Sequence, residues 1–146
     1  MNEQYALPRS QLLQWVHDAR ERTLELVSDL TDEQLMVPMM EAVNPFRWEL
    51  GHVAFFYDVF LLRALGSGAF LLKGAENLYD SFKVDHDDRW SLPLPSREET
   101  LAYLRRVLER VAQRLESRDP AGRDGYLHRL SILHEDMHAE AFTYMR

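Results

Sequence analysis

The stretch LHRLSILHEDMHAEAFTYM, residues 127–145, decides the fold class. Its apolar residues recur three or four positions apart, which is the period of an α-helix with one buried face. These residues are Leu127, Leu130, Leu133, Met137, Ala141, Phe142 and Met145. Because the rest of the chain shows no hairpin turn signal and no sustained alternation of apolar and polar residues, the sequence predicts an all-α protein.

Three other stretches share this helical period. They are residues 10–30, residues 45–65 and the residues between Ser96 and Asp119. Ser10 and Ser96 are expected N-caps, the latter in a capping box with Glu99, and Asn44 with Pro45 pairs a capping residue with a preset first helical position. Four helices, with a long loop (residues 66–95) between the second and third, favour an antiparallel four-helix bundle, whose interior often hosts metal sites.

The length and composition of the chain limit the number of domains that it can form. Its 146 residues, 46% of them hydrophobic, fit a single domain (1–146) with its own core. Residues 139–146 are still helical in pattern, with no Gly or Asn stop signal and no following Pro. We therefore expect the chain to be cut from a longer protein.

Composition also excludes several functions. Without cysteine, any metal must be held by imidazole and carboxylate groups. A net charge of -7 and a pI near 5.3 argue against a nucleic acid partner. No apolar run reaches the roughly 18 to 20 residues of a membrane span, and the charged first 20 residues are unlike a secretory signal, so we expect no membrane partner and a cytoplasmic location.

His134 and His138 carry the strongest chemical signal. They are four residues apart, so both imidazoles project from one face of the helix, about 40° apart. That face is the apolar one, where an unpaired buried imidazole costs on the order of 1 to 3 kcal/mol. Coordination of one metal ion would remove this cost. The alternative is a pair of histidines at the edge of the core, bonded to backbone carbonyls.

His52 supports the first interpretation, because on its own helix it shares an apolar face with Trp48, Phe56 and Val59. Two histidines from one helix and one from a facing helix could hold a metal and leave positions open for catalysis. Three imidazoles suit zinc, iron(II), nickel or copper, and the spacing of the histidines does not distinguish these metals.

The other histidines and acidic residues near the site are predicted to have supporting or surface positions. Glu135, Asp136 and Glu140 are expected to face solvent or support the ligands, and His17 and His128 to be surface histidines.

The loop at 79–90 combines acidic, basic and aromatic residues and is predicted to fold over the metal as a lid. In that interpretation Arg89 clamps a substrate carboxylate, and Tyr79 or Trp90 packs against an apolar or cationic group. The alternative is a solvated loop with local ion pairs.

Four motifs occur in an order typical of one family: Trp48-Glu49-Leu50-Gly51-His52, Leu78-Tyr79-Asp80-Ser81, the segment 86–95 with Arg89-Trp90, and His134-Glu135-Asp136-Met137-His138. With them, most of the chain resembles the DinB-like N-terminal domain of the non-haem iron sulfoxide synthases that make ergothioneine, and of the related selenoneine synthases.

The resemblance implies a DinB-like bundle that binds Fe(II) through His52, His134 and His138. It also implies an oxygen-dependent oxidoreductase that joins the sulfur or selenium of a small donor to C2 of the imidazole ring of hercynine. Family members carry a C-terminal domain resembling the formylglycine-generating enzyme, which this chain lacks. Met137 stands where some relatives have a glutamine that helps to hold hercynine, so Met137 is a third candidate substrate contact beside Arg89 and Tyr79.

Two other functions are compatible with the same residues. A DinB-type thiol transferase would use zinc or another divalent ion as a Lewis acid, without oxygen. A non-catalytic bundle would use the metal or the histidines only to stabilise the fold or a partner interface.

Overall fold

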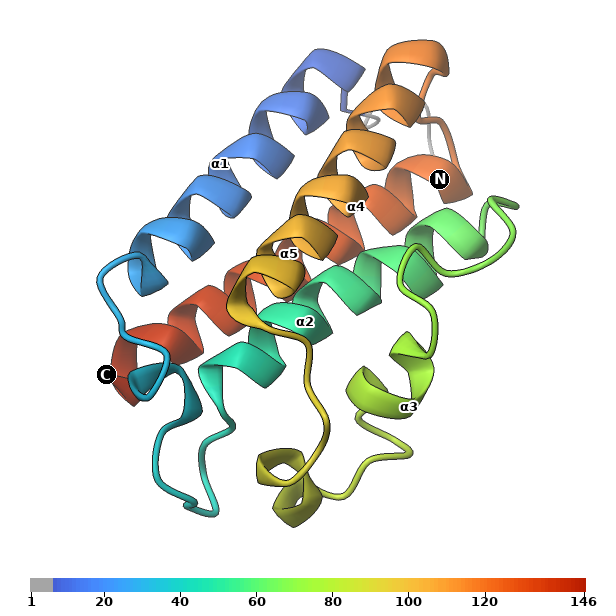
Figure 1. Cartoon of the computed structure of the whole chain (residues 1–146). Coiled ribbons are helices and arrows are strands. Elements are labelled where there is room, and N and C mark those ends of the chain that lie inside the picture. Colours follow the sequence, from blue (N-terminus) through green and yellow to red (C-terminus); the bar gives the residue numbers. More distant parts are fainter. Residues whose placement is uncertain (1–6) are drawn as a thin grey trace.

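The computed structural model describes residues 7–146, and this part of the chain contains helices and no β-strand (Figure 1). The four long rods are α1 (Arg9–Val27), α2 (Phe46–Phe56) with its π-helical continuation η3 (Tyr57–Arg63), α4 (Arg97–Ser117) and α5 (Arg123–Met145). The predicted all-α bundle is therefore confirmed. Residues 1–6 of the expected domain lie outside the described residues.

The long crossover between η3 and α4 sets the direction of the rods (Figure 1). Arg97, at the start of α4, donates to the Leu30 carbonyl just beyond α1, so α1 and α4 are antiparallel. Arg146, after the end of α5, pairs with Asp29, so α1 and α5 run in the same direction. Both α1 and α2 pack against both α4 and α5, which brings α2 and α5 face to face.

The helix starts differ in how they are capped. Ser96 accepts a hydrogen bond from the Glu99 backbone N–H at 3.1 Å, as the capping box predicts. The prediction for Ser10 was wrong: α1 begins at Arg9, and the Pro8 carbonyl accepts the first helical N–H bonds. Asn44 was also wrongly assigned as a cap. Pro45 occupies the N-cap of α2, because the Asn44 amide is bonded to Glu49 and Arg89 instead.

The connection at 64–96 contains more structure than its punctuated sequence predicted. It forms the short helix α3 (Ala75–Tyr79) and the 3-10 helix η4 (His86–Trp90). The Trp90 indole donates to the Val37 carbonyl at 2.8 Å, and His86 Nε2 lies 2.6 Å from the Val43 carbonyl. The crossover is thus held against the segment that joins α1 to α2.

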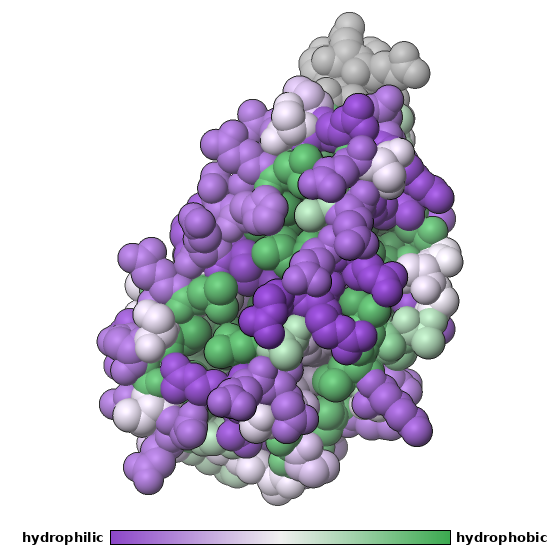
Figure 2. All heavy atoms as spheres, turned by 45° about the horizontal axis from the view of Figure 1, so that its top comes forward, coloured by the Kyte–Doolittle hydropathy of each residue, from purple (hydrophilic) through white to green (hydrophobic). Residues whose placement is uncertain are grey.

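A single core lies between the rods. Its largest fully buried side chains include Trp48, Tyr57, Tyr79, Tyr103 and Phe142. On the face shown in Figure 2, hydrophilic side chains predominate and the apolar ones form separate patches. Among the described residues, no helix combines the length and apolar character needed to cross a membrane.

Gly51 lets one aromatic ring approach α2 closely. A Cβ at this position would lie 2.1 Å from the Tyr79 ring, so only glycine leaves room for the ring. The close approach brings the end of α3 against α2, one residue before His52. The ring itself is fully buried, and the backbone carbonyl of Tyr79 reaches the His52 side chain.

Candidate metal centre

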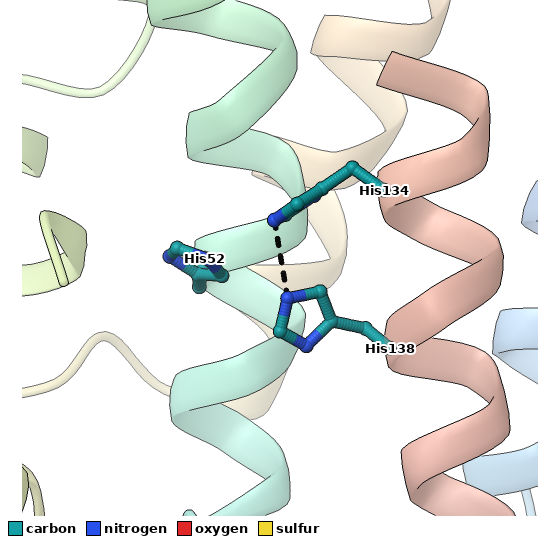
Figure 3. Close-up of side chains that lie close together, drawn as sticks. All are labelled: His52, His134 and His138. Atoms are coloured by element: carbon teal, nitrogen blue, oxygen red, sulfur yellow. Dashed lines mark hydrogen bonds between the residues drawn. The ribbon is translucent and has the colours of Figure 1, made fainter. Parts of the chain in front are cut away.

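Three histidines from two facing helices meet at one point of the bundle (Figure 3). His52 comes from α2, and His134 and His138 come from successive turns of α5. Each side chain offers a nitrogen, and these nitrogens lie within 4.8 Å of one another. The structure therefore brings together the three residues that the sequence nominated as metal ligands.

The His52 ring is fixed on both its edge and its face. Its Nδ1 lies 2.8 Å from the Tyr79 carbonyl, which can only accept a hydrogen bond, so Nδ1 carries the proton. Nε2 is left with a free lone pair, the form that binds a metal. The indole of Trp48 stacks on the ring, with centroids 4.8 Å apart and planes 10° apart.

His134 and His138 point their Nε2 atoms at each other, 3.1 Å apart (Figure 3). Two nitrogens that bind one ion at about 2.1 Å and at right angles lie about 3 Å apart, so this spacing suits a shared ion. The His134 ring stacks on Phe56 with centroids 3.7 Å apart, and its Nδ1 is buried without a hydrogen-bond partner. The donor set of three imidazoles therefore fits a divalent transition metal.

The protonation states of two rings favour metal binding. Burial lowers the pKa of His52 to about 4. Burial, followed by the effect of the neighbouring imidazoles, lowers the pKa of His134 to about 2. Both rings are therefore neutral at pH 7, so a metal ion would not compete with protons for them.

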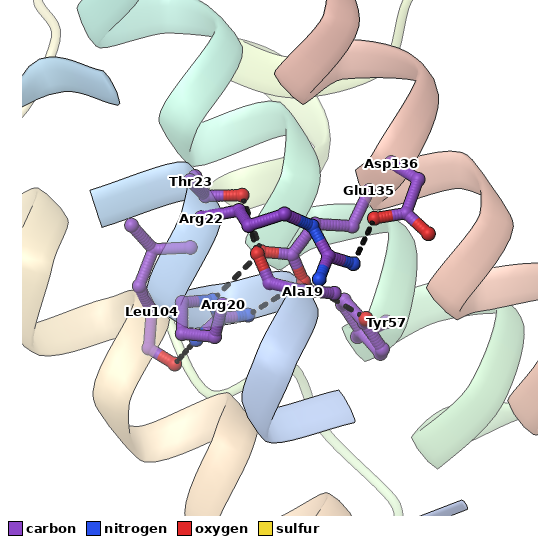
Figure 4. A network of polar contacts seen from close by, with 8 residues as sticks. All are labelled: Ala19, Arg20, Arg22, Thr23, Tyr57, Leu104, Glu135 and Asp136. Atoms are coloured by element: carbon purple, nitrogen blue, oxygen red, sulfur yellow. Dashed lines mark hydrogen bonds and ion pairs between the residues drawn. The ribbon is translucent and has the colours of Figure 1, made fainter. Parts of the chain in front are cut away.

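Glu135 has a different role from the solvent-facing or ligand-supporting one expected. It is 0% exposed and accepts from four donors of three other residues (Figure 4). The Arg20 Nε and the Thr23 hydroxyl donate to Oε2 at 2.9 and 2.8 Å. The Arg20 Nη2 and the Tyr57 hydroxyl donate to Oε1 at 3.4 and 2.9 Å. Glu135 thus links α5 to α1 and η3 inside the core and does not face solvent.

The remaining predictions near the site divide into two groups. Asp136 is partly exposed and pairs with Arg22, and Glu140 and His17 are exposed, as expected. The prediction that His128 lies on the surface was wrong. This residue is 1% exposed, its Nδ1 lies 2.7 Å from the Asp124 carbonyl, and its Nε2 is buried without a hydrogen-bond partner.

The three candidate substrate residues lie in different surroundings, and their roles remain predictions. The Arg89 guanidinium donates to Asn44 and to the Val84 carbonyl, and it lies 4.0 Å from the centre of the Trp48 ring. Tyr79 reaches the histidines through its backbone carbonyl rather than its buried ring. Met137, between the two histidines in sequence, is 66% exposed.

Glu49 belongs to the site, although sequence reasoning gave it no role of its own. It is 3% exposed, and its Oε2 lies 3.4 Å from Nδ1 of His138. Its spacing from His52, three residues earlier on the same helix, was the available signal, because residues at this spacing share a face.

The fold and the three-histidine cluster define a helical-bundle protein of the DinB class. The chain belongs to the DinB superfamily, whose family pattern matches residues 16–141. It is 32% identical to the hercynine oxygenase of Mycobacterium tuberculosis over 124 residues, which are 84% of this chain and 29% of that protein. It is 31% identical to the hercynine oxygenase of Mycolicibacterium thermoresistibile over 134 residues, 90% of this chain and 30% of that protein. The chain thus spans less than a third of the length of these relatives.

Proposed function

We propose that the chain is the metal-binding domain of an oxygen-dependent non-haem iron enzyme that forms a carbon–sulfur or carbon–selenium bond at C2 of the hercynine imidazole. The observation that carries the proposal is the meeting of His52, His134 and His138 with their nitrogens within 4.8 Å. The similarity to two hercynine oxygenases supports the choice of substrate.

In this proposal His52, His134 and His138 hold iron(II) through neutral imidazoles. Bound iron would supply the one-electron redox chemistry that the reaction with oxygen needs. Three protein ligands leave coordination positions open for small molecules. The stacked rings of Trp48 and Phe56 fix two of the imidazoles and exclude water from one side of each.

The surrounding residues would receive the substrate. Arg89 is the candidate partner for the hercynine carboxylate, because a guanidinium binds a carboxylate through two parallel bonds. It would have to exchange its bonds to Asn44 or Val84 for that purpose. Met137 would contact hercynine from α5, and the Tyr79 carbonyl would keep His52 in the tautomer that binds metal.

The proposed enzyme is longer than the described domain. The matched residues make up only 29% and 30% of the two relatives, which supports a longer native protein. We propose that the additional part is a C-terminal domain resembling the formylglycine-generating enzyme. Hercynine, a thiol or selenium donor and O2 are the proposed small-molecule partners, and a cytoplasmic location is part of the proposal.

The test is turnover by the full-length native protein, loaded with iron(II) and supplied with hercynine, oxygen and either a thiol or a selenium donor. Mass spectrometry should detect a product with sulfur or selenium on the imidazole, and none without iron or oxygen. Undiminished turnover without iron would refute the proposal. Thiol transfer with zinc in the absence of oxygen would indicate the transferase. Full activity of a destabilised His52→Ala variant would indicate a purely structural cluster.

A further inference from the structure

The two carboxylate oxygens of Glu49 have different surroundings. Oε1 accepts a hydrogen bond from the Asn44 side-chain amide at 3.0 Å. Oε2 is buried, has no hydrogen-bond donor, and lies 3.4 Å from Nδ1 of His138. A buried carboxylate oxygen without a donor costs free energy, so the site favours any arrangement that supplies one.

His138 can supply that donor. Its Nε2 faces Nε2 of His134, so Nδ1 is the nitrogen on the side of Glu49. A carboxylate only accepts hydrogen bonds, so a bond to Glu49 requires the proton to be on Nδ1. With the proton on Nδ1, Nε2 of His138 keeps a lone pair. His138 and His134 could then bind one metal ion through their Nε2 atoms. The 3.4 Å between Nδ1 and Oε2 is a few tenths of an ångström longer than a typical N–H···O hydrogen bond.

We propose that Glu49 is a positioning residue that holds His138 in its metal-binding tautomer and orientation. It does for His138 what the Tyr79 carbonyl does for His52. This inference rests on the metal site of the proposed function. Outer partners of this kind typically change metal affinity about 10- to 100-fold when they are removed.

Glu49 is itself held by a chain of contacts that ends in the crossover. Asn44 donates to Glu49 and accepts from Arg89 Nη1 at 2.8 Å. Arg89 also stacks over Trp48, whose indole lies against His52. One guanidinium therefore supports the orientation of two of the three imidazoles, and removal of Asn44 should weaken the hold on His138 without touching the ring.

The test uses the 146-residue chain and cobalt(II) alone as the probe, followed by its visible absorption. Glu49→Gln should weaken cobalt binding about 10- to 100-fold, because the new amide can donate to Nδ1 and stabilise the wrong tautomer. Asn44→Ala should give a smaller loss. The control is Asp58→Asn, since Asp58 is a buried carboxyl that accepts from Tyr103 and Leu71. Its cobalt affinity should equal that of the natural chain.

A second readout separates positioning from stability. Nitrogen-15 NMR of the metal-free chain should show His138 protonated on Nδ1, and Glu49→Gln should shift this proton towards Nε2. A natural chain with the proton on Nε2, or a Glu49→Gln variant with unchanged affinity and tautomer, would overturn the inference. If Glu49→Gln does not fold, Asn44→Ala carries the same test. Failure of the natural chain to bind cobalt would refute the metal site of the proposed function. The His138 tautomer measured by NMR in the metal-free chain would still show whether Glu49 positions the ring.

Discussion

Substitution of Glu135 by glutamine should cost about 3 to 5 kcal/mol of unfolding free energy, because it leaves a buried guanidinium without its counter-charge. Each Glu135 oxygen accepts from two donors, so whichever oxygen becomes an amide NH2 group, two donors lose their acceptor. The Thr23 hydroxyl can turn to the Ala19 carbonyl, but the side chain of Arg20 is only 4% exposed and cannot reach water. The predicted loss is a large part of the roughly 5 to 15 kcal/mol available to a domain.

Urea unfolding of the metal-free chain, followed by far-ultraviolet circular dichroism, measures this loss. Asp136→Asn is the matched control, because Asp136 is the next residue and pairs with another α1 arginine, Arg22. In that pair the side chains are 54% and 38% exposed, so the control should change stability by about 1 kcal/mol or less. Adding Arg20→Met to Glu135→Gln should recover part of the loss, since the buried charge is then gone. Equal effects of Glu135→Gln and Asp136→Asn would show that the buried ion pair of Arg20 and Glu135 does not stabilise the fold more than the exposed one.

Three further predictions concern stability and the site. Burial lowers the pKa of His52 to about 4 and that of His134 to about 2, whereas the unfolded chain takes up these protons near 6.5. The metal-free chain should therefore lose stability as the pH falls from about 6.5 towards 4, and protonation of His52 alone should account for up to about 3 kcal/mol of this loss. A urea midpoint that does not change over this pH range would contradict the prediction. Gly51→Ala should lower the free energy of unfolding by about 1 to 3 kcal/mol, although alanine favours a helix more than glycine, because the new Cβ would clash with the Tyr79 ring. Adding Tyr79→Ala should relieve the clash. If the losses of the two substitutions simply add, the clash is not the cause. Met137→Gln, at a 66% exposed position, should change the free energy of unfolding in urea by no more than about 0.5 kcal/mol, and a larger change would mean that the side chain supports the fold.

The all-α fold was largely predictable because its helices keep a 3.6-residue apolar period. The period did not identify the buried face of α5, where Leu133 and Met137 are 61% and 66% exposed and Glu135 is buried. Ser96 as a cap followed from local sequence alone. The starts of α1 and α2 did not, since Pro8 and Pro45 occupy their N-caps and the neighbouring Asn44 bonds to Glu49 and Arg89. Those partners come from tertiary structure, which periodicity does not encode. The small helices of the crossover are too short to produce a periodic signal.

The candidate site was predictable to the extent that its residues interrupt apolar faces. His52, His134 and His138 each do so, and the structure brings them together. Glu135 was misassigned because its helical angle places it about 100° from His134, yet that direction points to Arg20 and Tyr57 rather than to solvent. His128 was misassigned because charged sequence neighbours do not reveal which face of a helix is covered. Glu49 was missed as a support because its partner His138 lies on another helix.

The most direct test of the account is the stoichiometry of metal binding by the 146-residue chain. Anaerobic titration with iron(II), and with cobalt(II) as a coloured substitute, should show one ion per chain in the natural sequence. His52→Ala, His134→Ala and His138→Ala should each weaken binding strongly, while His17→Ala, at an exposed histidine of α1, should not. Binding of the same single ion with unchanged affinity after loss of any one of the three histidines would show that the cluster is not the metal site.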